Sequence, residues 1–121
     1  MAIKPIHRTR INKEAVRKGK RSPANLTEEM LPHAEQAATL LRALANEQRL
    51  MILCNLSGGE LSVGQLNERV PLNQSALSQH LAVLRKTGAV STRREAQTVY
   101  YSLKPGPAAD VIATLHSIYC R

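Results

Sequence analysis

The chain has 121 residues, 43% of them hydrophobic, and a formal net charge of +8 at pH 7. This length allows one modest core but not two independent domains, and the longest apolar runs, such as "LMILC", fall far short of the ~20 residues of a membrane-spanning helix. No secretory signal follows the N-terminal charges, so we expect a cytoplasmic protein with no membrane association.

The basic residues are concentrated at the N-terminus. Residues 1–21 contain eight Lys or Arg and one Glu, a net charge of +7, whereas residues 22–121 contain nine bases and eight acids, a net charge of +1. We interpret residues 1–25 as a flexible basic arm that binds phosphates without reading sequence, or else as a solubilising leader. The folded domain is then expected over residues 26–121.

Two helices are predicted at the start of this domain. The first covers residues 26–44 with Thr27 as N-cap, although Pro32 leaves open a later start. The second lies within residues 45–60, with Asn46 as N-cap, and the two glycines at its end stop it. Its apolar stripe consists of Leu50, Leu53, Cys54 and Leu56.

A helix-turn-helix pattern follows. In residues 61–70, "LSVGQLNERV", Ser62 is a candidate N-cap and apolar residues recur at helical spacing. The turn "PLNQS" leads into a second helix over residues 73–87, and Gly88 is well placed to end it. Two helices joined by a four-residue turn are typical of DNA-binding proteins.

The two faces of the helix at residues 73–87 differ in chemistry. At about 100° per residue, leucines form one narrow arc: Leu77, Leu81 and Leu84. The opposite face is small, polar and basic, without a carboxylate: Ser75, Gln79, Ala82 and Lys86, flanked by Ser78 and Arg85. Such a face fits the major groove, where short polar groups approach base edges and bases meet phosphates. An ordinary solvated helix face is the alternative.

His80 lies beside the leucine arc. It is interpreted as a partly buried histidine that is hydrogen-bonded to backbone, or as a phosphate contact. Ser78 and His80 are two residues apart on a helix and therefore diverge by about 200°, so they cannot share a proton. This geometry excludes a serine-hydrolase couple.

After Gly88 the pattern changes to that of a β-hairpin. Residues 89–103, "AVSTRREAQTVYYSL", have a β-rich run on each side of a polar middle, which predicts a wing. Arg93 and Arg94 near its tip are expected to contact phosphate or the minor groove, with Gln97 assisting, whereas Glu95 weakens the local positive field.

A final amphipathic helix is expected over residues 108–120, which gives a mainly α protein with a β-hairpin wing in the order α-α-α-α-β-β-α. Cys54 and Cys120 are too few for a disulfide scaffold and lack the close pairing of a zinc site. They are either small buried hydrophobes or reactive thiols, and His116, one turn before Cys120, would favour a thiolate there.

Four stretches carry a family resemblance: "LLRALANEQRLMILCNL", "ELSVGQL", "LNQSALSQHLAVLRKTGAVSTRREAQTVYYSL" and the last helix. Over residues 35–120 the chain resembles the ArsR/SmtB family of dimeric winged-helix bacterial repressors. The resemblance implies a homodimer formed through the first and last helices, bound to double-stranded DNA at an inverted-repeat operator with half-sites about one helical turn apart. With the polar face and the wing, it gives these DNA-binding residues: Gln74, Ser75, Ser78, Gln79, His80, Arg85, Arg93, Arg94 and Gln97.

The resemblance also bears on the signal. Ser62 and Gly64 stand where thiols form a metal site in the family, and Asp110 with His116 does not complete its second metal site, so no metal and no cofactor are expected.

The two cysteines resemble those of the persulfide- and redox-sensing branch of BigR, SqrR and HlyU-type regulators. This implies a repressor that leaves DNA when a reactive sulfur species or oxidant joins Cys54 and Cys120 within one protomer. A metal-responsive repressor, an antirepressor that displaces another silencer, and a thiol redox enzyme remain alternatives; we expect no enzymatic activity.

Overall fold

The computed structural model describes residues 23–120, which belong to two compact units that meet between Ala37 and Ala38. The predicted basic arm lies outside the described residues, except that its last three residues already begin a helix. None of the described helices is long and apolar enough to cross a membrane.

The predicted first helix is divided into three parts. α2 (Pro23–Met30) is followed by a 3-10 turn, η1 (Leu31–His33), and then by α3 (Ala34–Leu44). The prediction of Thr27 as N-cap was wrong, because α2 begins four residues earlier. Pro32 lies in η1, where its missing N–H interrupts the regular helical hydrogen bonding.

The second unit begins within α3 and contains the predicted helix-turn-helix and the last helix. The cap predictions at Asn46 and Ser62 are confirmed: Asn46 accepts from the Arg49 N–H at 3.0 Å, and Ser62 forms a reciprocal capping box with Gln65. Asn73 caps the next helix in the same way. The helices of this unit are α4 (Glu47–Leu56), α5 (Val63–Arg69), α6 (Gln74–Lys86) and α7 (Pro107–Tyr119).

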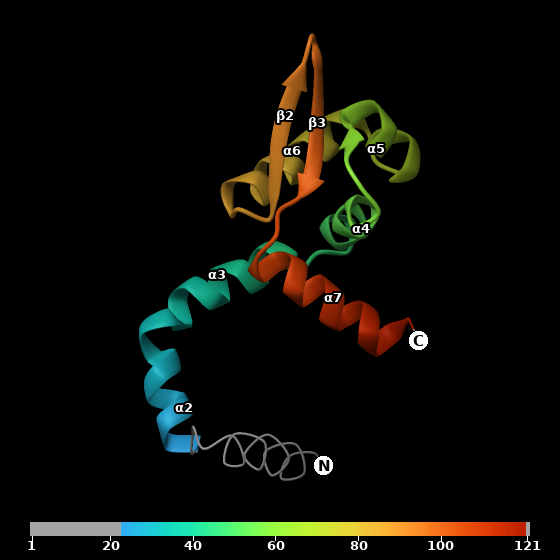
Figure 1. Ribbon diagram of the computed structural model, residues 1–121. Helices are drawn as coiled ribbons and strands as arrows, with labels where there is room; N and C mark the ends of the chain where they lie inside the picture. The colour runs from blue at the N-terminus through green and yellow to red at the C-terminus, as the bar shows by residue number, and fades with distance from the viewer. Residues whose placement is uncertain (1–22, 121) are drawn as a thin grey trace. The chain divides into compact units, whose positions relative to one another are not determined.

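The predicted hairpin is confirmed as β2 (Val90–Glu95) and β3 (Thr98–Leu103), which project from the helices as a wing (Figure 1). A short strand that was not predicted, β1 (Leu61–Ser62), pairs with the other side of β3. The antiparallel sheet therefore has the order β1-β3-β2, and its central strand joins the wing to the start of α5.

Gly88 ends α6 and turns the chain into the wing, as predicted. It has a φ of +81°, a conformation that favours glycine. The Gly88 N–H donates to the carbonyl oxygen of Arg85 at 3.1 Å, and the Ala89 N–H donates to that of Leu84 at 2.9 Å. This pair of hydrogen bonds is a Schellman motif, which fixes the direction of β2 relative to α6.

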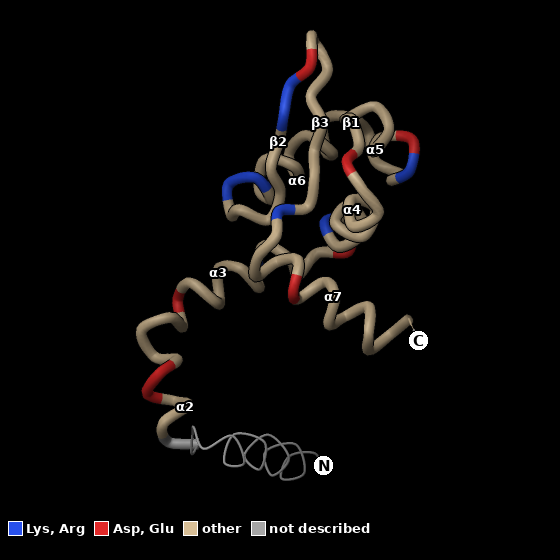
Figure 2. The backbone as a smooth tube through the Cα atoms, in the orientation of Figure 1, with Lys and Arg blue, Asp and Glu red and all other residues tan. Residues whose placement is uncertain are grey.

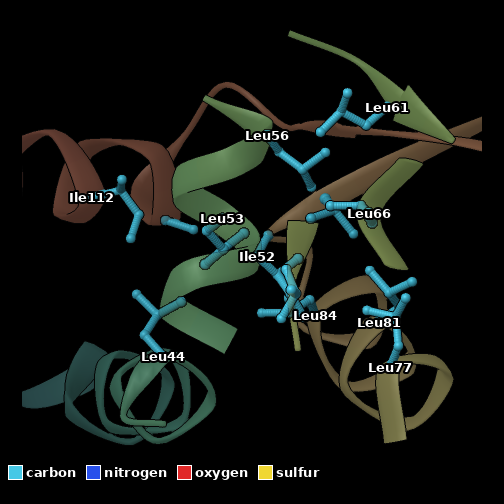
Figure 3. Packing of buried hydrophobic residues seen from close by; sticks show 14 residues of the cluster. Leu44, Ile52, Leu53, Leu56, Leu61, Leu66, Leu77, Leu81, Leu84 and Ile112 are labelled. Carbon is cyan, nitrogen blue, oxygen red and sulfur yellow. The ribbon is translucent and has the colours of Figure 1, made fainter. Parts of the chain in front are cut away.

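The core of the second unit is aliphatic (Figure 3). The predicted arc of α6 is confirmed, since Leu77, Leu81 and Leu84 are at most 2% exposed. They pack with leucines and isoleucines of neighbouring elements: Leu44, Ile52, Leu53, Leu56, Leu61, Leu66 and Ile112. Within the described residues no polar side chain is buried, and the packing of these aliphatic side chains holds α6 against α4 and α5.

Candidate nucleic-acid interface

The face of α6 opposite the leucines is open to solvent. Its polar and basic side chains are exposed over the whole length of the helix: Gln74, Ser75, Ser78, Gln79, Arg85 and Lys86. The two bases lie in the last turn, where positive charge is favourable to the helix dipole, and Figure 2 shows them at one end of α6. This is a surface of small polar groups with cations at its edge.

His80 is half-buried at the side of this face, as predicted, but its partner is a side chain rather than backbone. Arg49 Nη1 lies 3.2 Å from His80 Nδ1. The same guanidinium donates through Nε to the carbonyl oxygen of Ala43 at 2.5 Å and through Nη2 to that of Arg42 at 3.5 Å. Arg49 therefore links the end of α3 to α6.

Arg93 of the wing is engaged within the molecule. Its Nε and Nη2 donate to the two carboxylate oxygens of Glu60 at 2.7 and 2.9 Å, and Nη1 donates to Glu95 at 3.0 Å. Its guanidinium also lies 4.5 Å from the centre of the Tyr100 ring, its register partner on β3. Arg93 thus ties the wing to the segment before β1.

The ion pair shifts the pKa of both Glu60 and Arg93. The hydrogen bond from Arg93 lowers the pKa of the Glu60 carboxyl, although partial desolvation opposes it. The hydrogen bonds to Glu60 and Glu95 raise the pKa of Arg93. Two carboxylates surround the Arg93 guanidinium, so this part of the wing carries no excess positive charge.

Arg94, the next residue, is exposed and forms no side-chain hydrogen bond or ion pair within residues 23–120. Gln97 is also exposed and lies in the two-residue turn of the hairpin after Ala96, whose φ is +56°. The structure thus separates the two predicted wing cations: Arg93 is held by carboxylates, while Arg94 is available to an external anion.

Both cysteines are exposed and free. The prediction that Cys54 belongs to the apolar stripe of its helix was wrong: Ile52, Leu53 and Leu56 face the core, and Cys54 lies on the outer side of α4. Cys120 follows α7 directly. Across residues 23–120 no group of three or more His, Cys, Asp or Glu side chains is arranged to hold a metal ion.

Sequence reasoning missed Arg49, Glu60 and Tyr100. The sequence pattern placed Arg49 in a helix but could not pair it with His80, because the two residues are 31 positions apart. Glu60 is 33 positions from Arg93. The pairing of Tyr100 with Arg93 follows from the hairpin register, so an alignment of the two strands about Ala96 and Gln97 could have found it.

Comparison with known proteins agrees with this arrangement. The family model described as "Bacterial regulatory protein, arsR family" matches residues 46–92, from the N-cap of α4 into β2. The chain is 53% identical over 102 residues to the transcriptional activator HlyU of Vibrio cholerae, a match that spans 84% of this chain and 94% of that protein. It is 44% identical over 102 residues to the biofilm growth-associated repressor of Agrobacterium fabrum, covering 81% and 87%.

Solved structures show the same fold. Reduced HlyU from Vibrio cholerae superposes with a TM-score of 0.72 at 53% identity, covering 78% of this chain and 99% of that one. The transcriptional repressor BigR from Xylella fastidiosa superposes with a TM-score of 0.71 at 40% identity, covering 78% and 96%. The relatives are regulators rather than enzymes.

Proposed function

The chain belongs to the arsR family of bacterial regulatory proteins and is a DNA-binding transcriptional regulator; from this premise we propose that it is a homodimeric repressor controlled by its two cysteines. In this proposal, α6 and the wing bind an inverted-repeat operator. Persulfidation or oxidation of Cys54 and Cys120 then lowers the affinity for that operator.

The observation that carries the DNA-binding part is the exposed polar face of α6 beside a wing in which Arg94 has no partner among the described residues. Gln79 is suited to donate to and accept from adenine in the major groove, and Ser75 and Ser78 are short enough to allow close approach. Arg85 and Arg94 would then meet phosphates on either side of the groove. Because β2 follows α6 through the Gly88 turn, helix and wing present these groups as one rigid surface.

Apolar groups that this chain leaves uncovered support the homodimer. On α2 and η1, Leu26, Met30 and Leu31 are 37%, 51% and 72% exposed and line a shallow apolar groove. On α7, Ile118 and Tyr119 are 54% and 79% exposed. Exposed leucine, methionine and tyrosine of this kind are typical of interfaces between subunits, which fits dimerisation through the first and last helices.

The exposure of both thiols supports the sensing part, because a solvent-accessible cysteine can meet a small reagent that a core residue would exclude. An organic persulfide transfers its outer sulfur to one cysteine and leaves as a thiol. The other thiolate then attacks the inner sulfur of that protein persulfide, releases hydrogen sulfide and closes a disulfide. Peroxide gives the same bond, with two electrons and two protons passing to oxygen as water.

The test is operator binding before and after treatment with glutathione persulfide. Wild-type protein should release DNA and lose two hydrogens per protomer by mass spectrometry, and Cys54→Ser should bind DNA when reduced and keep it after treatment. Ser57→Ala is the matched control and should respond like wild type, because it removes the exposed hydroxyl at the C-cap of α4, which donates to the Cys54 carbonyl oxygen, and leaves both thiols in place. Normal release by Cys54→Ser would remove the thiol switch from the proposal.

One observation favours a second candidate function, in which the protein activates transcription instead of repressing it. The relative with 53% identity is named a transcriptional activator, whereas the Agrobacterium relative is named a repressor. An activator that acts by displacing a silencer would use the same DNA contacts. Deletion of this protein's gene distinguishes the two, because transcription of the operator-linked gene rises for a repressor and falls for an antirepressor.

A further inference from the structure

Arg49 is the side chain through which three helices of the second unit meet. Its backbone N–H is held by the Asn46 cap at the start of α4. Its guanidinium binds two of the carbonyl groups at the end of α3 and reaches His80 on α6. A cation at this position satisfies carbonyls that a helix end leaves without partners.

The contact with His80 determines where the imidazole proton lies. A guanidinium has only donors and is charged at any pH at which the protein is folded. Since Arg49 donates, Nδ1 of His80 must accept, and the ring proton of the neutral imidazole must be on Nε2.

Nε2 of His80 is open to solvent. It has no hydrogen-bond partner within the described chain. Every inaccessible side-chain nitrogen or oxygen among the described buried and half-buried residues has a partner, so Nε2, which has none, must be accessible. The histidine thus offers one N–H donor outward, beside the face formed by Ser75 and Gln79.

We propose that Arg49 is a positioning residue for DNA recognition: it holds His80 as the Nε2–H tautomer, so that this N–H donates to a phosphate oxygen of the operator. The inference rests on the proposed function of α6. In this proposal Arg49 itself does not bind DNA, because three of its five side-chain N–H donors bind the carbonyl groups of α3 and His80, and the residue is half-buried. Loss of Arg49 therefore leaves the ring free to rotate and to exchange tautomers.

The first half of the test needs no DNA. Two-bond ¹H–¹⁵N spectra of the full-length protein at neutral pH separate the two tautomers of a neutral imidazole. Wild type should show the Nε2–H form. The matched control Arg42→Met should show it too, because it removes a nearby guanidinium that donates to Thr39 and not to His80. Arg49→Met should show a mixture, and Arg49→Lys, which keeps the charge and can still donate, should restore the Nε2–H form in part. A His80 spectrum that is identical in Arg49→Met overturns the proposal whether or not the protein binds an operator.

The second half measures operator affinity as a function of salt concentration for Arg49→Met, His80→Ala and the double variant, each checked for folding by circular dichroism. Each single variant should bind about fivefold more weakly, and the double variant no more weakly than either, because both remove one contact. The dependence of log affinity on log salt should not change, since a neutral N–H donor displaces no counterion.

Two results of these binding measurements would contradict the positioning role of Arg49. A slope that falls by about 0.9 per protomer in Arg49→Met would make Arg49 a direct phosphate contact, and additive losses in the double variant would show that the two residues act independently. Either result overturns the positioning role. If wild type binds no operator, the proposed function fails, while the tautomer measurement still decides the pairing of Arg49 with His80.

Discussion

Replacement of Arg94 by alanine should reduce the salt dependence of operator binding. In the described chain Arg94 is the wing cation without an internal carboxylate partner, whereas Arg93 is neutralised by Glu60 and Glu95. One phosphate contact contributes about 0.9 to the slope of log affinity against log salt, so two wings of a dimer contribute about 1.8. When salt is raised about fourfold, wild type should therefore lose about twelvefold more affinity than Arg94→Ala.

The assay is fluorescence anisotropy of labelled operator at several salt concentrations. Arg94→Lys keeps the charge and should keep the slope. Removal of the paired charges together, in Arg93→Ala with Glu60→Ala, leaves the net charge of the protein unchanged and should also keep the slope. An unchanged slope in Arg94→Ala, or an equal loss in the charge-paired variant, would refute the division of roles between the two arginines.

Three other predictions concern the reading helix, the wing and the core. Ser78→Ala with Gln79→Ala should abolish the preference for operator over unrelated DNA while the oligomeric state stays the same; unaltered selectivity in competition binding would show that another surface reads the bases. Because Arg93 lowers the pKa of Glu60, the stability from this pair is present above the unfolded pKa of Glu60 and is lost as the pH falls through its lower folded pKa. The carboxyl titration of Glu60, followed by NMR, should move upward in Arg93→Ala, and a midpoint equal to that of wild type would contradict the pairing. Leu84→Ala removes a fully buried side chain and should lower the free energy of unfolding by about 2–5 kcal/mol in chemical denaturation; a loss below about 1 kcal/mol would place Leu84 outside the core.

Local features of the chain could be predicted from the sequence. The three leucines of α6 recur at helical spacing, and Asn46, Ser62 and Gly88 act within three residues of the groups they bind. Such features depend only on neighbours along the chain, so the helix-turn-helix, the hairpin and the exposed face of α6 followed from residue types and their spacing.

Features that depend on the tertiary arrangement could not be predicted in this way. Arg49, the partner of His80, and Glu60, one partner of Arg93, are each more than thirty residues away along the chain. β1 has two residues, too few to show alternation. Cys54 was assigned to the core stripe because a helical pattern leaves its exact rotation uncertain; in the structure α4 turns Ile52 inward instead.

The purely aliphatic core has a consequence for how regulators of this kind diversify. Ile52 and Leu53 are fully buried, while the adjacent Cys54 points outward from the same helix. A substitution at that outward position changes reactivity without opening a cavity or stranding a polar group. Under the proposed thiol switch, a change of inducer would therefore need only surface substitutions, and the core that holds α6 would stay the same.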